Sequence, residues 1–486
     1  MRYRCSFRSL ALFIGLGLTL LPGPGFGKDS EAINLDVSEA VETALRENLG
    51  LKLKQEDVAF AEGAARAAEG TFDALLSADM GAGETNSVPV SIIGAGEERS
   101  AGWNAGVQKR FSSGTEMDLS WNNSNLDTDS EIYLFDPVYN TGVMIGVSQP
   151  LLKGLGSEVQ MADINSARSQ LEARSFLVDS EAADLAATVK NGYWELVFAH
   201  QNLDVLQLAL KLAERLRDDT STRIKAGKLA SIDLYQPESE VAQREQDLIT
   251  GERAVGVAED NLKFLMNSRN WLTPFKPVDL PETQPIEPDI AKVLENALTN
   301  RPDVKAASLQ IQASEYQVTK SENEILPALN LIGSVGYGGA ADSYSGALDN
   351  SFSDSDTRWQ LGVTISRPFD NSLAEGQHRQ ALALRNKNRT SLELLKQQIR
   401  RTVRVTVRDI ELALKAIDAT RKTATATQKR LEAEQIKFDA GRSTTLDVLI
   451  AQQDYARALS NENRSKVIYS QSLAELDRIQ GMITIP

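Results

Sequence analysis

Apolar residues recur every seven positions in two long stretches of the chain. In residues 158–225 the repeat is carried by Val189, Leu196, Leu203 and Leu210, and in residues 376–439 by Val403, Ile410 and Ile417. A sustained heptad predicts long helices that pack as a left-handed coiled coil. At 1.5 Å per residue, each helix would be a rod of about 100 Å. A second apolar row in the first stretch gives that helix two packing neighbours, as in the wall of a tube: Phe198, Val205 and Leu212.

Both predicted rods end in the same turn. An Ala-Gly pair is followed by small or polar residues and then by an aspartate, Asp233 in the first copy and Asp447 in the second. Glycine just past a helix end supplies the left-handed conformation, and Asp suits the start of the next helix. Residues 223–238 and 437–452 are near-copies with an offset of 214 positions. We therefore expect two helical hairpins and an internal two-fold repeat.

Alternation with a period of two replaces the helical pattern in residues 72–150 and 328–368. Large apolar residues alternate there with small or polar ones, and Ser-Ser-Gly-Thr before Glu116 is a hairpin signal. Strands of about ten residues with one apolar face are typical of a transmembrane β-barrel. A half-buried soluble sheet produces the same alternation. Prolines at Pro150 and Pro368 mark the ends of the two strand regions.

The number of strands is less clear from the pattern. We expect four main strands per chain, and an additional hairpin, Trp103 to Trp121, that either extends the barrel to six strands or forms a β-ornament beyond it. Four strands cannot close a barrel alone, because small barrels need about eight. Several chains would have to share one barrel.

The N-terminus has the features of a secretory signal peptide. Three arginines precede an apolar run of 12 residues, and small residues end the segment at Gly27. The run is short of the roughly 20 residues that a spanning helix needs. Cys5, the only cysteine, lies inside residues 1–27, so the exported chain would have no thiol, disulfide or thiolate metal site.

Charge and hydropathy narrow the function further. Loss of the signal would move the net charge from −15 to −18, which disfavours binding to nucleic acid. No later segment has 18 consecutive apolar residues, so an exported chain that enters a membrane would do so as β-strands.

The sequence predicts the following division of the chain. Residues 1–27 are the signal peptide, and residues 28–270 are a first repeat of helix, strands (72–150) and hairpin, with its tip near 226–233. Residues 271–289 are a proline-rich connector. Residues 290–486 are a second repeat, with strands at 328–368 and a tip near 440–447.

The sequence argues against an enzyme. His200 and His378 are the only histidines, and neither has catalytic neighbours at a recognisable spacing. No phosphate-binding glycine loop is present, and we expect no cofactor or metal. A non-conducting coiled-coil surface or structural protein is the alternative. It would explain the signal and the heptads, but not the two-fold repeat.

These motifs, in this order and twice over, resemble the TolC-like outer membrane efflux protein family, the outer membrane factors. The resemblance covers essentially the whole exported chain. It is carried by LDVSEAVETALRENLGL and ENALTNRPDVKAA, SQPLLKG and SRPFDN, and AGKLASIDL and AGRSTTLDVLIAQ.

The resemblance implies an α+β membrane protein that forms a homotrimer. A shared transmembrane β-barrel of about four strands per chain lies in the outer membrane and continues as a periplasmic α-helical coiled-coil barrel. The function implied is the exit duct of a tripartite efflux or type I secretion system. Its partners would be a periplasmic adaptor, or membrane fusion, protein, an RND or ABC pump of the inner membrane, and outer-membrane lipid.

The resemblance also assigns roles at the tips. The gate candidates at the periplasmic entrance are Asp447, Asp233 and Arg442, and the adaptor-contacting candidates are Gly227, Leu229, Gly441, Arg442 and Ser443. Ile450 stands where the TolC-like gate has a second aspartate, and Arg442 is one place from the gate arginine. The alternative roles are helix capping for Asp447, turn geometry for the glycines and simple solvent exposure for Arg442.

Overall fold

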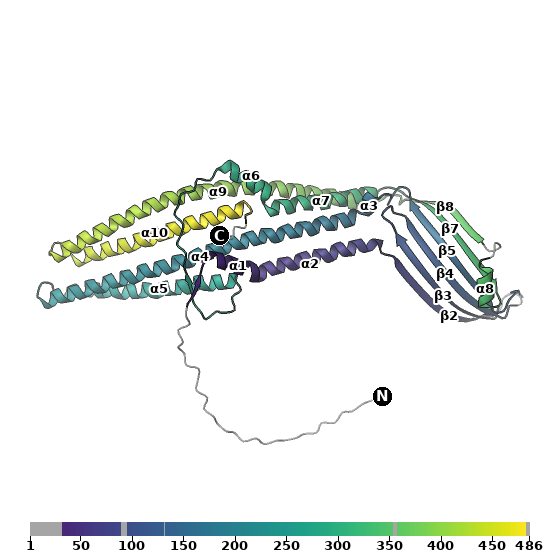
Figure 1. The fold of residues 1–486 in the computed structure, drawn as a ribbon, viewed down its shortest axis with the longest axis horizontal. Coiled ribbons are helices and arrows are strands. Elements are labelled where there is room, and N and C mark those ends of the chain that lie inside the picture. The colour runs from purple at the N-terminus through teal and green to yellow at the C-terminus, as the bar shows by residue number, and fades with distance from the viewer. Residues whose placement is uncertain (1–31, 89–94, 131, 353–356, 483–486) are drawn as a thin grey trace, which may run out of the picture.

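The computed structural model describes residues 32–88, 95–130, 132–352 and 357–482. The predicted signal peptide lies outside them. The molecule is elongated, with a β-sheet at one end and long helices that extend away from it (Figure 1). Among the described residues, no helix is both long enough and apolar enough to cross a membrane.

The two halves of the chain run through the same order of elements. The first has α1 (Val37–Glu47), α2 (Leu49–Glu69), strands, α3 (Ser157–Gln160), α4 (Ala162–Lys225) and α5 (Tyr235–Leu265). The second has α6 (Ile290–Asn300), α7 (Pro302–Asn323), strands, α9 (Ser372–Asp439) and α10 (Thr445–Ile479). Asn48 divides the first helix pair with φ −59° and ψ 128°, and Arg301 divides the second with φ −58° and ψ 127°.

The long helices form as the heptads predict. α4 has 64 residues and α9 has 68, which makes each about 100 Å long. From Ile399 onward, heptad side chains of α9 are buried: Ile399, Val403, Thr406, Ile410, Ala413, Ile417, Ala424, Leu431 and Phe438. Toward the far end α4 packs on both α5 and α10, so the prediction of two neighbours is confirmed.

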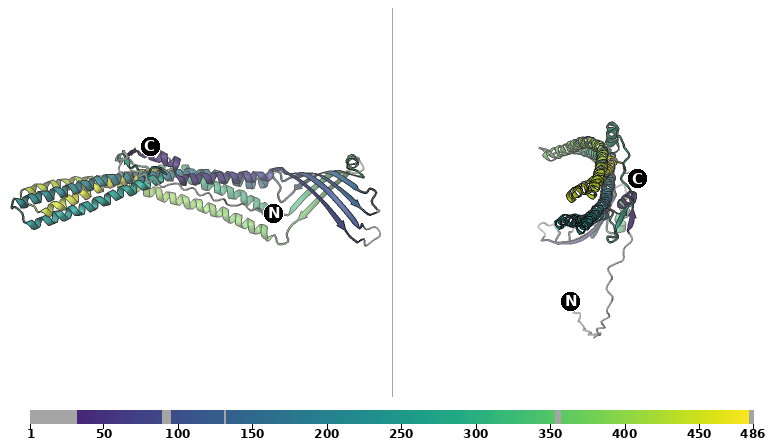
Figure 2. Two further views of the ribbon diagram at one scale, coloured as in Figure 1. Left: turned by 90° about the horizontal axis from the view of Figure 1, so that it is seen from below. Right: turned by 90° about the vertical axis from the view of Figure 1, so that its left-hand side faces the viewer.

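The helices lie side by side in a curved layer. Nearer the sheet the order is α2, α4, α7, α9, and toward the other end it is α5, α4, α10, α9. Seen from the far end, this layer is an arc that is open on one side (Figure 2).

Six strands make one antiparallel sheet in the order β2-β3-β4-β5-β7-β8. Their bounds are Leu75–Asn86, Glu97–Arg110, Glu116–Thr128, Val138–Pro150, Ala328–Ala341 and Thr357–Ser366. The expectation of four main strands is therefore wrong. The hairpin Trp103 to Trp121 belongs to β3 and β4, which pair along their whole length, as β2 and β3 also do.

The register gives the sheet two different faces. Directly paired residues point to the same face, and Val335, opposite both Ile145 and Trp359, lies on an apolar one. Leu361, Val363 and Ile365 share this face and are exposed. Ser77, Asp79, Asn104, Asn122 and Gln360 lie on the other, polar face. This distribution is typical of strands that separate lipid from an aqueous space.

The connector between the halves is bound to the helices by two buried tyrosines. β6 (Phe275–Pro277) pairs in parallel with β1 (Ile33–Leu35). Beyond it, the hydroxyl of Tyr193 on α4 accepts hydrogen bonds from the amides of Val278 and Asp279, at 3.2 and 3.1 Å. Tyr469 on α10 accepts one from Ile286 N at 3.2 Å. The connector thus ties α4 to α10.

We predict that Tyr193→Phe loosens this connector. Tyr193 is completely buried, and loss of its hydroxyl leaves the amide of Asp279 without its acceptor, while the amide of Val278 keeps its bond to Leu35 O at 3.1 Å. The expected cost is about 1–3 kcal/mol of unfolding free energy. It can be measured as a lower midpoint of thermal unfolding and as faster proteolysis within residues 278–289. The matched control is Tyr235→Phe, at an exposed tyrosine, and equal behaviour of the two variants would contradict the prediction.

Candidate functional site

Both hairpin tips lie at the end of the molecule farthest from the sheet (Figure 1). The first tip joins α4 to α5 and the second joins α9 to α10. All the residues that the sequence predicts for the gate and the adaptor contact lie in these two turns.

The turns have the same backbone geometry. Gly227 and Gly441 have φ of 72° and 71°, in the left-handed region that favours glycine. In each turn the next residue donates back to the last turn of the helix, Lys228 N to Arg223 O at 2.9 Å and Arg442 N to Lys437 O at 2.8 Å. A Cβ on either glycine would meet open space, so only φ demands glycine there.

Thr444, not Asp447, is the N-cap of α10, and Asp447 at the third helical position completes the cap. Its Oδ2 accepts hydrogen bonds from Thr444 N at 3.0 Å and Thr444 Oγ1 at 2.6 Å, while Asp447 N donates to Thr444 Oγ1 at 3.2 Å. This reciprocal pair is a capping box. Ser443 lies beside it and donates to Glu434 Oε2 at 2.9 Å.

The cap lowers the pKa of the Asp447 carboxyl. The hydrogen bonds from Thr444, side chain first and then backbone, hold the pKa of Asp447 below its ordinary 3.8. The stability that this group contributes is therefore present above pH 3.8 and is lost as the pH falls through the lower pKa of the folded state. The carboxylate is exposed, so it keeps its charge at neutral pH while it caps the helix.

The other predicted residues take different positions. Asp233 accepts from Ala230 N at 3.0 Å and closes the first turn, as Asp447 closes the second. Arg442 is exposed, and Leu229 is half-buried. Exposed apolar side chains, Ile232 and Tyr235, follow Leu229 at the first tip.

Arg223 joins the two tips, and sequence reasoning missed it. Its guanidinium donates to Phe438 O and to Asp439 Oδ1, both at 2.7 Å. It also lies 4.2 Å from the centre of the Phe438 ring. The internal repeat contained one signal for it. Arg223 corresponds to Lys437, so both tips carry a cationic side chain at the same position.

The histidines lie elsewhere. His200 is on α4, and His378 is on α9, with Nδ1 3.1 Å from Ser321 Oγ. Within the described residues, no three side chains of His, Cys, Asp or Glu are grouped so that they could hold a metal ion.

Comparison with known proteins identifies the family. The pattern that defines the outer membrane efflux proteins matches residues 114–268 and 293–482, which is more than half of the chain. This chain belongs to the outer membrane efflux protein family. It is an outer-membrane protein, and its helical part is periplasmic. The match begins after α1, α2, β2 and β3.

The chain is also similar to one curated protein, the pyoverdine export outer membrane protein OpmQ of Pseudomonas aeruginosa. The two are 25% identical over 308 residues, which span 60% of this chain and 60% of OpmQ.

Solved structures share the fold over nearly the whole chain. The outer-membrane channel OprN has a TM-score of 0.71 at 16% identity, with 93% of this chain and 91% of OprN covered. VceC of Vibrio cholerae has a TM-score of 0.67 at 16% identity, with 92% and 96% covered. At these identities the likeness establishes the fold alone.

We predict that Arg223→Ala separates the two tips. The variant loses a bond to a backbone carbonyl and an ion pair with the exposed Asp439, together about 1 kcal/mol. Amide hydrogen exchange at residues 223–233 and 438–447 should become about fivefold faster. Lys225→Ala, at an exposed lysine in the same turn of α4, is the control. Unchanged exchange in Arg223→Ala would show that the contact does not hold the tips together.

Proposed function

We propose that three copies of this chain form a passive exit duct across the outer membrane, with no chemistry of their own. One observation carries the proposal. The sheet ends in two unpaired edge strands, and the arc of helices ends in two exposed apolar edges on the same two sides of the chain. A shape of this kind closes on itself only with further copies.

The helical edges are apolar and exposed. On one side they carry Phe60 of α2 and Phe264 of α5, which are 81% and 72% exposed. On the other side α9 carries Leu412 and Ile436, which are 53% and 70% exposed. Apolar stripes of this kind mark interaction surfaces. The α2/α5 edge of one copy would pack on the α9 edge of the next, and the ring would enclose a tunnel.

The sheet edges are complementary in direction. β2 follows α2, and β8 leads into α9, so the sheet and the helices present corresponding edges. In a six-stranded antiparallel sheet the first and last strands run in opposite directions, so β2 and β8 of neighbouring copies would pair antiparallel. Three copies, the number that the TolC-like resemblance implies, would bring eighteen strands. The polar face would line the opening, and the apolar face would meet lipid.

The direction of transport is outward, and the driving force is external. The description of OpmQ as an export protein supports export for this chain. The tunnel would receive cargo at the tips from an RND or ABC pump of the inner membrane through a periplasmic adaptor. The exposed turns at Gly227, Leu229, Gly441, Arg442 and Ser443 would contact that adaptor.

The tips would also close the tunnel. Asp447 and Asp233 of three copies would present rings of carboxylates at the entrance, and such rings attract cations. The capping bonds that lower the pKa of Asp447 suit this role. Arg223 would hold the hairpins of each copy together, so that they move as a unit.

The charge of Asp447 can be tested apart from its capping role. Asp447→Asn keeps an oxygen that accepts from Thr444 N but removes the negative charge. We expect it to raise single-channel conductance in planar bilayers or to weaken block by multivalent cations. Asp418→Asn, at an exposed carboxylate in the middle of α9, is the control.

Two outcomes would count against these roles. No change in either property for Asp447→Asn and Asp233→Asn would remove both residues from the gate. A folded trimer that never conducts, even as Asp447→Ala, would remove the duct and favour a non-conducting stalk.

The adaptor contact can be tested with a photoreactive amino acid at Arg442. This exposed residue is a better position than Gly441, whose positive φ disfavours a side chain. We expect a crosslink to an exported adaptor protein, identified by mass spectrometry, and none from the same amino acid at Asp418. Equal labelling from both positions would contradict docking at the tips.

A further inference from the structure

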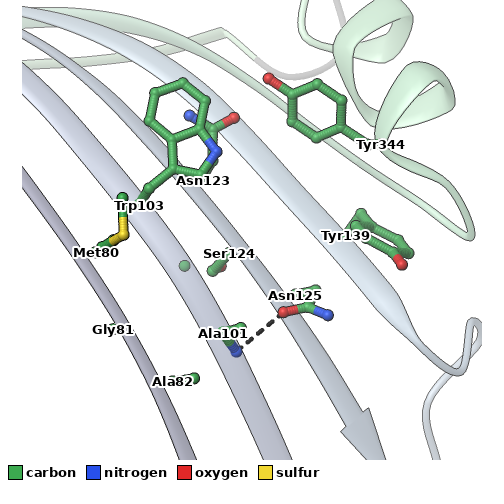
Figure 3. A pocket seen from close by; sticks show the side chains of 11 residues that line it. Met80, Gly81, Ala82, Ala101, Trp103, Asn123, Ser124, Asn125, Tyr139 and Tyr344 are labelled. Atoms are coloured by element: carbon green, nitrogen blue, oxygen red, sulfur yellow. Dashed lines mark hydrogen bonds between the residues drawn. The ribbon is translucent and has the colours of Figure 1, made fainter.

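A cavity of about 550 Å³ opens on the apolar face of the sheet near the end farthest from the helices. Met80, Trp103 and Tyr139 line it from the sheet (Figure 3). Tyr344 comes from α8 (Tyr344–Asn350), the short helix between β7 and β8, and lies across from Trp103. Most of the exposed lining is apolar, and the family match begins beyond the strands that carry Met80 and Trp103.

The register assigns the cavity to the apolar face. Trp103 is paired with Met80 on one side and with Asn123 on the other, and Asn123 is paired with Thr141. Thr141 stands two places from Val143 in β5 and therefore points to the same face. α8 covers this face too, because any side chain at Gly339, which is paired with Thr141, would collide with the backbone of α8.

One polar side chain in this wall is unsatisfied. Asn123 is only 5% exposed, and its Nδ2 has no hydrogen-bond partner within the described structure. Its Oδ1 accepts from Thr141 Oγ1 at 2.6 Å, and Thr141 Oγ1 in turn accepts from Trp121 Nε1 at 3.1 Å.

The chain of donors fixes the orientation of this amide. An indole N–H can only donate, so the Thr141 oxygen must accept from Trp121 and give its own proton to Asn123. A flipped Asn123 would leave the Thr141 proton without that acceptor. The amide NH₂ group is therefore a buried donor on the cavity wall, and a buried donor of this kind calls for an acceptor.

We propose that this cavity binds the acyl chain of an outer-leaflet membrane lipid, with a carbonyl oxygen of that lipid accepting a hydrogen bond from Asn123 Nδ2. The proposal rests on the proposed duct, because that function turns the apolar face toward lipid. The side chains that line the cavity belong to the apolar face of the sheet, so under the proposed function a lipid would reach the cavity without leaving the membrane.

The shape and chemistry of the cavity match such a ligand. Its volume lies within the 300–1,000 Å³ that is typical of small-molecule sites. Trp103, Tyr139 and Tyr344 are the amphipathic aromatic residues that favour the boundary between hydrocarbon and headgroups. A lipid provides both an apolar chain for these walls and a carbonyl at that depth for Asn123. Cargo in the duct would pass the opposite, polar face of the sheet.

The test uses the full-length protein in vesicles of phosphatidylethanolamine and phosphatidylglycerol. The probe is a phosphatidylethanolamine with a diazirine beside the carbonyl of one acyl chain. After irradiation, mass spectrometry locates the labelled residues. We expect labelling to concentrate on the cavity residues of β3, β4 and α8. It should fall at least fivefold in Asn123→Leu, which lacks the donor, and in Ala82→Phe, which fills the cavity.

Asn122→Leu is the matched control, because Asn122 neighbours Asn123 but points to the polar face. Its labelling should equal that of the wild type. Asn123→Leu and Ala82→Phe should conduct as the wild type does, because both positions lie on the apolar face away from the opening, which separates this site from the duct. Labelling in Asn123→Leu and Ala82→Phe that equals the labelling of the wild type would overturn the lipid site while leaving the duct intact. Labelling on the apolar face of β8 as strong as that of the cavity residues would do the same. A lack of conductance with cavity labelling retained would overturn the duct alone.

Discussion

Backbone hydrogen bonding is the constraint on which this structure depends. Inside a membrane every strand N–H and C=O needs a partner, because lipid offers none. Within the described sheet β2 pairs only with β3, and β8 only with β7, so one chain leaves two full-length edges open. Because the sheet has an even number of antiparallel strands, β2 and β8 run in opposite directions, so β2 of one copy and β8 of another could pair antiparallel. In the proposed duct, further copies of the chain would supply partners for these open edges.

The helices also leave two edges uncovered, and both of these edges carry exposed apolar side chains. In the proposed trimer the sheet would fix which copy is the neighbour, and the α2/α5 edge of one copy would then meet the α9 edge of the next. The connector holds α4 to α10 through Tyr193 and Tyr469, so the arc of each copy is set before assembly. At the far end the turns are held by caps and by Arg223, beside a buried apolar cluster that includes Phe438, Val448 and Leu449. In the proposed duct, closure of the tunnel would depend on these contacts at the tips.

Much of the fold could be predicted from local patterns. The heptads predicted the two long helices, because the residues on one packing face of a helix recur every two turns. Gly227 and Gly441 predicted the two turns, because the left-handed backbone conformation at each turn favours glycine. The count of four was wrong because the pattern does not show whether the hairpin Trp103 to Trp121 pairs with the other strands. The pairing of β3 with β2 and of β4 with β5 places this hairpin in the sheet, which is the six-strand alternative.

At the candidate site, capping by Asp447 could be foreseen, since its partner Thr444 is three residues away. The contact of Arg223 with Phe438 could not, because it joins residues 215 positions apart. The unsatisfied amide of Asn123 likewise depends on Thr141 and Trp121 in neighbouring strands. Side-chain contacts between distant segments leave no periodic trace in a sequence.

The most direct test of this account is a cryo-electron microscopy reconstruction of the full-length protein in lipid nanodiscs. We predict a three-fold ring in which β2 of each copy pairs with β8 of the next, eighteen strands form one barrel, and α9 packs on α2 and α5 of its neighbour. A reconstruction with unpaired β2 and β8 edges, or with the β2–β3 hairpin outside the barrel wall, would contradict it.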